Sequence, residues 1–439
     1  MRSTADVVIC GCGIAGAAAA YHIAVRRGVR NVVIVDEREP LTLTSDKGTQ
    51  AYRNWWPGPD DTMLRLVSRS IDLLEETSAE SGHAFRLNRR GYLFATADSD
   101  KLAQLEKTAR QVSSFGMGEV RRHSTMATYH PALAEGFGGQ PTGADLLIGD
   151  SARDAFPYLA DDTVGALHVR RAGWLSAVAL GSWLLSQAVA NGARFVRDRV
   201  TRVDTAGGRV REVHLASANS ITTDRLVVAA GPGLPAFARM LGVDLPVFSE
   251  LHAKMTLRDP RRAVGRDAPF LIWADPVHLD GEPEPRPAGV HIRPIDLAHG
   301  DELYLIWTFE TEPREFSWPP SFDRSYGDVV LRGAARMVPR LAPYVAEGAA
   351  ATGFIDGGFY CKTPENRPLI GPLPIEGAFV LGALSGMGVM SAHASGELVS
   401  LHVAGEQLPE YARWFLPSRY DDPAYRKLVE EWGPLVGQL

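Results

Sequence analysis

Three glycines near the start of the chain, Gly11, Gly13 and Gly16, have the spacing of a loop that binds the two phosphates of a dinucleotide. They directly follow the apolar run 7–9, so the pattern predicts a strand that turns into a helix. Gly11 permits the tight turn, Gly13 lets the backbone approach the phosphates, and Gly16 lets the helix pack closely on the strand. The phosphates then meet the free N–H groups and the positive end of the helix.

A carboxylate stands where the ribose of such a dinucleotide would bind. Residues 31–35 predict a second buried strand that ends at Asp36, about twenty positions after Gly16, which is the spacing of a ribose-binding acid. Glu37 takes this role if the strand runs one residue longer. A glycine-rich turn in an unrelated α/β protein is the alternative interpretation of the motif.

Composition excludes several classes of protein. The chain has 439 residues, enough for two or three domain-sized units, and a formal net charge of −6, which gives no electrostatic case for nucleic acid. The first strand begins too early to leave room for a signal peptide, and no apolar run reaches membrane-spanning length. Three cysteines are too few for a disulfide framework, and Cys10 and Cys12 are expected to be small turn residues. We therefore expect a cytoplasmic protein with a small-molecule partner and no metal site.

Two kinds of sequence alternate along the chain. A helix over 175–189, strands near 194–196, 200–203 and 210–215, and an apolar strand that ends in small residues at 229–233 continue the first pattern. The stretches 85–159 and 241–341 instead carry aromatic, alternating strands between polar and Pro-rich loops. These stretches predict a mostly antiparallel domain inserted between parts of the first.

The C-terminal third carries two further motifs. Residues 358–372 read GFYCKTPENRPLIGP, and residues 383–390 read ALSGMGVM. Together with the N-terminal glycines and 228–231, they resemble the flavin-dependent amine and amino-acid oxidoreductases: D-amino-acid oxidase, glycine oxidase, sarcosine oxidase and dimethylglycine dehydrogenase. The resemblance implies an α/β fold in which a Rossmann-like FAD-binding domain of the glutathione-reductase type is interleaved with a mostly antiparallel α+β substrate domain. The ranges expected are 1–84, 160–240 and 342–439 for the FAD-binding domain and 85–159 and 241–341 for the substrate-binding domain.

The resemblance also implies the cofactor and its contacts. FAD is expected, with 385–388 against the flavin ring and with Met387 where the family often has histidine. The loop 44–50 would pass the isoalloxazine, with Lys47 reaching the ring edge or, alternatively, solvated. The cofactor-binding residues expected are Gly11, Gly13, Ile14, Ala15, Gly16, Asp36, Glu37, Ser45, Lys47, Gly48, Thr49, Val200, Ala230, Gly231, Gly386, Met387, Gly388, Val389 and Met390.

This chain differs from its relatives in two ways, one of which bears on how FAD is held and the other on the fate of a removed methyl group. Relatives that bind flavin covalently use a cysteine shortly before the Thr-Pro pair or a histidine in the early loop, and Gly358 and non-histidine residues stand there in this chain. We expect dissociable FAD, although Cys361 is close enough in sequence to leave a covalent link open. The dimethylglycine-dehydrogenase relatives continue into a folate-binding domain, whereas this chain ends at Leu439. A methyl group that it removed should leave as formaldehyde.

Candidate catalytic residues are cations and aromatics, because flavin amine oxidation needs an oriented C–H bond and a clamp for a carboxylate. Over 248–255, period-two alternation puts Glu250, His252 and Lys254 on one face, although an edge strand with its polar face in water would give the same pattern. Arg53 matches in place an arginine that sarcosine oxidases use for carboxylate binding, but Met390 replaces a lysine of those enzymes and argues against sarcosine itself. The candidates are Arg53, His252, Lys254, His291, Arg293 and Tyr360.

The function expected is FAD-dependent oxidation of an amine C–N bond in an amino acid or N-alkyl amino acid, by hydride transfer to flavin N5, giving an imine that hydrolyses. The alternatives are an FAD-dependent dehydrogenase of an α-hydroxy acid or polyol and a flavin-binding regulatory protein without catalysis. The electron acceptor is O2 or a protein carrier. A monomer or a small homo-oligomer is expected.

Overall fold

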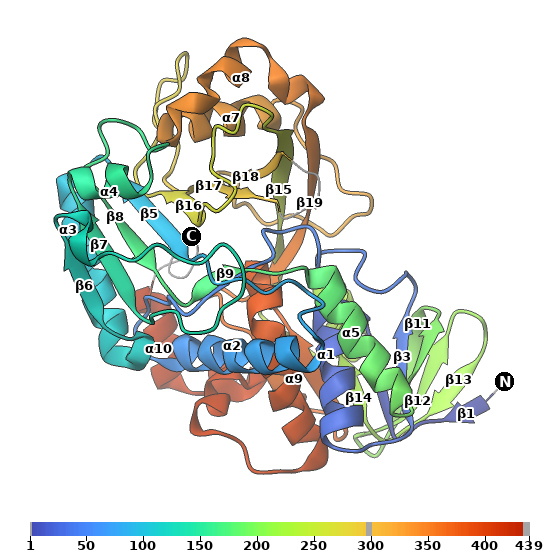
Figure 1. The fold of residues 1–439 in the computed structure, drawn as a ribbon. Helices are drawn as coiled ribbons and strands as arrows, with labels where there is room; N and C mark the ends of the chain where they lie inside the picture. Colours follow the sequence, from blue (N-terminus) through green and yellow to red (C-terminus); the bar gives the residue numbers. More distant parts are fainter. Residues whose placement is uncertain (1, 296–300, 433–439) are drawn as a thin grey trace.

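The structure is a computed structural model that describes residues 2–295 and 301–432. Residue 1 and the segments 296–300 and 433–439, which belong to three of the ranges assigned from the sequence, lie outside the described part. Two large sheets dominate the molecule (Figure 1), one of six strands and one of nine.

The six-stranded sheet is the nucleotide-binding half that the glycine motif predicts. Its order is β10-β3-β2-β14-β21-β20, and all neighbours are parallel except β20 and β21. The central strands are apolar and fully buried, as expected for a parallel sheet covered on both faces. The bounds are β2 Val7–Cys10, β3 Val32–Asp36, β10 Arg194–Arg197, β14 Leu226–Val228, β20 Leu369–Pro372 and β21 Ala378–Gly382.

Helices and a small sheet cover the two faces of this sheet. α1 (Ile14–Tyr21) packs against α5 (Ala177–Ala190) and α9 (Gly388–Ala404), and α2 (Thr62–Glu80) lies outside α9 (Figure 1). α1 and α9 approach closely because Gly396 faces Ala18, where a Cβ would lie 2.7 Å from the Ala18 carbonyl carbon. The opposite face packs against a four-stranded sheet, β1-β13-β12-β11. Its bounds are β1 Arg2–Thr4, β11 Val200–Ala206, β12 Arg209–Leu215 and β13 Ser220–Thr222.

The nine-stranded sheet has the order β19-β15-β18-β17-β16-β5-β8-β7-β6 and is antiparallel except for the pairs β16–β5 and β6–β7. α7 (Tyr326–Met337) covers its centre and contributes to a separate apolar core that contains Trp273 and Trp307. The strand bounds are β5 Tyr92–Thr96, β6 Val120–His123, β7 Ala144–Ile148, β8 Gly165–Val169, β15 Phe248–Arg258, β16 Phe270–Trp273, β17 Val290–Pro294, β18 Glu302–Trp307 and β19 Phe354–Lys362.

Smaller elements complete the chain. β4 (Ala51–Arg53) and β9 (Ala172–Trp174) pair with each other and form a separate two-stranded sheet. The remaining helices are α3 Ser99–Val112, α4 Asp150–Ala155, α6 Leu234–Met240, α8 Ala342–Ala346 and α10 Pro423–Trp432. Across 2–295 and 301–432, no helix combines the length and the apolar character needed to span a membrane.

The architecture confirms the predicted fold class and adds two details. β8 and β19 are both strands of the nine-stranded sheet, although their residues fall in ranges expected for the FAD-binding domain. The domain ranges themselves stay a prediction. β15 is not an edge strand, because it pairs with β19 on one side and with β18 on the other. Its polar face is also turned toward protein rather than toward water, because Glu250 and Lys254 are buried.

Candidate cofactor cavity and the buried cations beside it

A cavity of about 990 Å³, partly open to solvent, lies at the carboxyl ends of β2, β3 and β14 and extends to β19. This is the edge at which open parallel sheets bind their ligands. Thirteen of the nineteen expected cofactor residues line it: Gly11, Gly13, Ile14, Ala15, Asp36, Ser45, Gly48, Thr49, Ala230, Gly231, Gly386, Gly388 and Val389.

The glycine loop has the geometry that its spacing predicts. Gly11 has φ +103°, and a Cβ there would lie 2.3 Å from the carbonyl oxygen of Ala229. Gly16 does not line the cavity but packs the helix on the turn, since its Cβ would lie 1.9 Å from the Gly11 carbonyl oxygen. Ser45 of the flavin loop accepts the Ile14 N–H at 2.9 Å, which ties that loop to the start of α1.

Of the two acids expected near the ribose, Asp36 lines the cavity and Glu37 does not. The two oxygens of Asp36 accept the Cys12 N–H at 2.7 Å and the Arg38 N–H at 2.9 Å, which leaves lone pairs for further donors. Burial raises the pKa of Asp36. Glu37 points outward and lies 3.7 Å from the Arg199 guanidinium, because β3 ends at Asp36.

Tyr360 of β19 marks the other end of the cavity. A Cβ at Gly48 would lie 2.7 Å from its hydroxyl oxygen, and a Cβ at Gly386 would lie 2.8 Å from its ring. The ring therefore fits between the loop 44–50 and the loop 385–388, and burial raises the pKa of Tyr360 to about 12. Behind the second loop, α9 begins at Gly388, so its N-terminus faces the cavity as expected.

Four further expected cofactor residues do not line this cavity in the structure. The Lys47 ammonium pairs with Asp356 at 2.9 Å instead of reaching the cavity, because a partly buried cation is stabilised by a carboxylate. Val200 pairs with Leu215 at the start of β11, in the four-stranded sheet. Met387 and Met390 are buried in the core, since the turn before α9 directs only backbone toward the cavity.

The sequence analysis missed Arg38, which lines the cavity beside Asp36. Its Nε is buried, and no described group accepts a hydrogen bond from it. A basic residue two positions after the ribose carboxylate was the available signal. The glycine turn, the Asp36 carboxylate and this orphaned donor are the groups that a dinucleotide such as FAD requires, so the residues present fit the expected cofactor.

Arg53 is buried at the end of β4 with unusual partners. Its Nε–H donates to the Trp55 carbonyl at 3.2 Å, and its guanidinium lies over the rings of Trp56 and Tyr92, at 5.3 and 5.5 Å from their centroids. No carboxylate of the described chain lies within 4 Å of it, and burial lowers the pKa of Arg53. A planar guanidinium in such a setting can bind a carboxylate through two parallel hydrogen bonds.

The polar face of β15 forms a buried chain behind Tyr360. The Glu250 carboxylate bonds to Lys362 Nζ at 3.0 Å and to His252 Nε2 at 2.8 Å, and His252 Nδ1 lies 3.1 Å from the Thr308 hydroxyl. The imidazole stacks on the Tyr360 ring, with centroids 4.2 Å apart. Burial lowers the pKa of His252, so the ring is neutral, donates Nε2–H to Glu250 and accepts from Thr308.

Lys254 and Arg293 bind the backbone of the flavin loop. Lys254 Nζ donates to the Asp46 carbonyl at 2.6 Å, and Arg293 Nε donates to the Thr49 carbonyl at 2.8 Å. Both cations lie over the Tyr304 ring, and burial lowers the pKa of Lys254 to about 8. They are placed to position the loop. His291 bonds through Nδ1 to a backbone carbonyl of its own turn and contacts Phe270.

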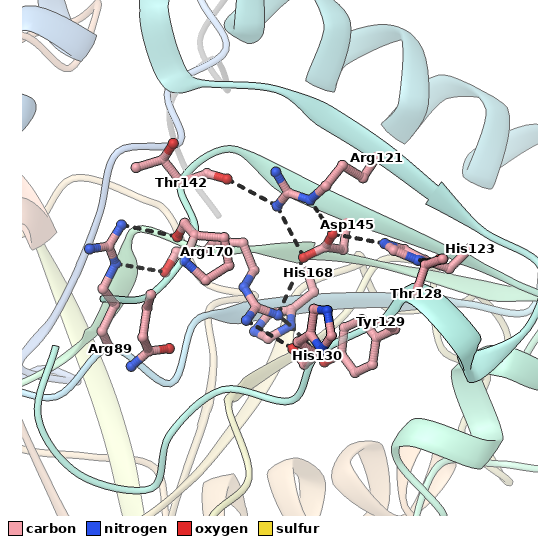
Figure 2. Close-up of polar contacts among 12 residues, drawn as sticks. Arg89, Arg121, His123, Thr128, Tyr129, His130, Thr142, Asp145, His168 and Arg170 are labelled. Atoms are coloured by element: carbon pink, nitrogen blue, oxygen red, sulfur yellow. Dashed lines mark hydrogen bonds and ion pairs between the residues drawn. The ribbon is translucent and has the colours of Figure 1, made fainter. Parts of the chain in front are cut away.

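A second buried charged cluster lies far along the nine-stranded sheet, on β6, β7 and β8 (Figure 2). Its centre is Asp145, which accepts from Arg121 at 2.7 Å and from His123 at 2.8 Å, with Arg170 at 3.3 Å. His168 Nδ1 and the Tyr129 hydroxyl share a hydrogen bond of 2.9 Å. We call these residues the Asp145 cluster. Its carboxylate is saturated with donors, which indicates a structural role.

The cysteines and one group of possible metal ligands are also candidates for a role in binding. All three cysteines are free and buried, and burial raises the pKa of Cys361 to about 12 although it lines the cavity. At Gly358, a Cβ would lie 3.1 Å from Lys47 Cβ, which leaves little space for a linking cysteine. Within the described residues, one group could hold a metal ion: Asp204, Glu212 and His214. Arg2 and Arg202 already pair with its two carboxylates.

Comparison with known proteins agrees with this geometry. The model of the family described as FAD dependent oxidoreductase matches residues 6–400. The chain is 25% identical to mitochondrial sarcosine dehydrogenase of Mus musculus over 97% of its own length and 41% of that protein, so it spans about two fifths of that relative. It is 24% identical to monomeric sarcosine oxidase of Streptomyces avermitilis, over 91% of this chain and 94% of that one. The structure of L-proline dehydrogenase from P. horikoshii superposes with a TM-score of 0.75 at 18% identity, covering 96% of this chain and 99% of that one.

Proposed function

Because this chain belongs to the family of FAD dependent oxidoreductases, we propose that it oxidises the C–N bond of an amino acid or N-alkyl amino acid, giving an imine that water hydrolyses. The family membership carries the cofactor, and FAD supplies a hydride acceptor at its N5 when bound. The substrate class rests on the residues beside the cavity.

The observation that carries the proposal is Arg53. The substrate carboxylate would bind its guanidinium, because this buried cation contacts the Trp55 carbonyl and the side chains of Tyr92 and Trp56 but no carboxylate among the described residues. A planar guanidinium binds a carboxylate through two parallel hydrogen bonds and so fixes its direction as well as its distance. Arg53 also follows directly from the loop that lines the cavity, so its carboxylate partner would lie near the cofactor.

Tyr360 would form the wall against which the substrate amine is oriented. Its ring is fixed on three sides, by Gly48, by Gly386 and by the His252 imidazole. In this buried position the phenol stays protonated, since burial raises the pKa of Tyr360 to about 12. Orientation of the reacting C–H bond by such rigid walls is the main contribution a protein makes to this kind of reaction.

The released amine tests the reaction. The purified protein is incubated with amino acids, N-methyl amino acids and α-hydroxy acids in air and with an artificial electron acceptor, and the products are identified by mass spectrometry. Oxidation at the α carbon releases ammonia or methylamine with a keto acid or aldehyde, and oxidation at an N-methyl carbon releases the demethylated amino acid with formaldehyde. A turnover confined to hydroxy acids would contradict the proposal and favour the α-hydroxy acid dehydrogenase, which could use the same Arg53 clamp.

Several finer points stay predictions. They are dissociable FAD, release of any removed methyl group as formaldehyde, O2 or a protein carrier as acceptor, a monomer or small homo-oligomer, and a cytoplasmic location. The buried Cys361 thiol supports the first of these, because a protonated thiol is a poor nucleophile toward a flavin.

A further inference from the structure

The segment 308–325, which we call the crossing segment, joins β18 to α7 and contains no helix or strand. It carries two large apolar side chains that are more than one third exposed, Phe316 at 36% and Trp318 at 38%. Exposed aromatic residues on a long loop are often placed there to contact a partner or a ligand.

Both aromatic rings contact residues that line the cofactor cavity. The Trp318 ring lies 5.2 Å from the Arg38 guanidinium carbon, and the Phe316 ring lies 5.5 Å from the Phe359 ring. Arg38 and Phe359 are on the cavity wall, one beside the ribose carboxylate and one next to Tyr360. The crossing segment starts from the nine-stranded sheet, so the domain of this sheet, which already supplies Tyr360 at one end of the cavity, also reaches its nucleotide end.

The segment is anchored on both sides of these rings. The Arg314 N–H donates to the Ser249 carbonyl at 2.7 Å. The Phe322 ring packs on Gly357, where a Cβ would lie 2.8 Å from the ring. Because β15 and β19 fix its ends, the middle of the segment is held over Arg38 rather than extended into solvent.

Arg38 supplies the observation that points to a ligand. Its Nε is buried with no acceptor among the described residues, and the nearest carboxylate, that of Glu37, lies 3.7 Å away, beyond hydrogen-bond distance. Buried N–H donors without acceptors are rare in folded proteins. The donor lies beside Asp36 in the cavity, where a ribose hydroxyl or a phosphate oxygen of a dinucleotide would supply the missing acceptor.

We propose that Trp318 and Arg38 form a second wall of the FAD site, supplied in part by the substrate domain, that binds the adenosine diphosphate half of the cofactor. The Trp318 ring lies against the Arg38 guanidinium and reduces its contact with water, which strengthens the bond from Nε to the nucleotide. The inference rests on FAD as the cofactor and not on the proposed amine reaction.

The experiment measures ligand binding to the apoprotein of wild type and Trp318→Ala by flavin fluorescence. FAD and FMN are titrated directly, and ADP is titrated as a competitor of FAD. We expect Trp318→Ala to weaken FAD and ADP by the same factor, about tenfold, and to leave FMN unchanged, because FMN lacks the adenosine half. Phe354→Ala, a substitution of a 66% exposed aromatic residue on β19, is the matched control and should change none of the three.

A double-mutant cycle separates this role from a general effect on folding. Arg38→Gln should also weaken ADP, and Trp318→Ala should add little in that background, because both act on one interaction. Unchanged ADP binding in Trp318→Ala, or an equal loss for FMN and ADP, would overturn the proposal. Each of these results is independent of any turnover, so failure of the amine reaction leaves the test intact.

Discussion

Two buried charged regions of this molecule differ in how their charges are matched. In the Asp145 cluster, the carboxylate accepts from Arg121 and His123 and lies beside Arg170 (Figure 2). Beside the cofactor cavity, the Arg53 guanidinium bonds to one backbone carbonyl and to Tyr92 and lies over two aromatic faces, with no carboxylate among its described partners. The first region is complete without a ligand, whereas the second lacks an anion.

The difference separates structure from function among residues of the same types. The Asp145 cluster has the residue types of a catalytic site, namely histidines, arginines and an aspartate. The donors around Asp145, however, leave no oxygen lone pair for a bond to a substrate. Burial would raise its pKa, yet hydrogen bonds from Arg121 and His123 lower the pKa of Asp145 overall. Incomplete pairing of a buried charge is therefore a better guide to a binding site than the presence of titratable residues.

Removing the unpaired cation should have the largest effect. Arg53→Gln is expected to lower kcat/KM for amino-acid substrates about 1000-fold, corresponding to about 4 kcal/mol, because the substrate carboxylate would be buried without its partner. Steady-state kinetics on the FAD-loaded protein measures this. Amines of the same shape without a carboxylate serve as the control and should lose much less; an equal loss for both would show that Arg53 does not bind the carboxylate.

Removing the central charge of the saturated cluster should affect stability instead. Asp145→Asn is expected to lower the free energy of unfolding by about 3 kcal/mol, since it leaves the buried guanidinium of Arg170 and its neighbours without a counter-charge. Urea denaturation monitored by circular dichroism measures the loss. The folded protein should keep its kcat, and a large fall in kcat would place the Asp145 cluster in the reaction.

The stacking of His252 on Tyr360 should contribute a smaller kinetic effect. His252→Ala removes the ring that stacks on Tyr360 and is expected to lower kcat about fivefold without changing FAD affinity, because the cost of a lost aromatic pair is about 1 kcal/mol. His252→Phe keeps the stacking and loses the hydrogen bonds to Glu250 and Thr308. It should recover most of the rate; no recovery would assign the effect to the hydrogen bonds.

Lys254 predicts a pH dependence of stability with a definite sign. Burial lowers the pKa of Lys254 in the folded protein to about 8 from 10.5, so the unfolded chain binds more protons between these values. Stability attributable to this residue therefore rises as pH increases from about 8 to 10.5. The free energy of unfolding of wild type minus that of Lys254→Met, measured at several pH values, should increase over this range; a decrease would mean that the ammonium is stabilised by its surroundings.

The smallest effect is expected at Cys361. The substitution Cys361→Ser should not change how much flavin the protein binds, because the pKa of about 12 keeps this thiol protonated. Acid precipitation of wild type and variant should release all the flavin into the supernatant. Flavin that stays with the precipitated wild type and not with the variant would reveal a covalent link.

Local patterns predicted the nucleotide half of this molecule well, because its constraints are local. The turn at Gly11 agrees with its positive φ, and the strand that ends at Asp36 agrees with a short apolar run. The expected cofactor positions that do not line the cavity depend on distant partners: Lys47 pairs with Asp356, and Met387 packs in a core formed by other elements. Arg38 was missed because its orphaned Nε becomes visible only once the surrounding chain is folded.

The substrate side shows the same limit. Alternation on β15 placed Glu250, His252 and Lys254 on one face, which the structure confirms, but their different partners could not be read from it. His252 contacts Tyr360 and Lys254 contacts the flavin loop because of pairing with β19 and packing against residues 46–48, more than one hundred positions away. Long-range register decides which of several candidate cations is matched and which is left for a ligand.

The most direct test of the account is the visible spectrum of the FAD-loaded protein under anaerobic conditions, with amino acids, N-methyl amino acids, their α-hydroxy analogues and amines without a carboxylate added in turn. The account predicts that an amino acid or N-methyl amino acid bleaches the flavin band and that its analogue without a carboxylate does so far more slowly. Bleaching by hydroxy acids alone, or bound FAD that none of the four classes reduces, would contradict it.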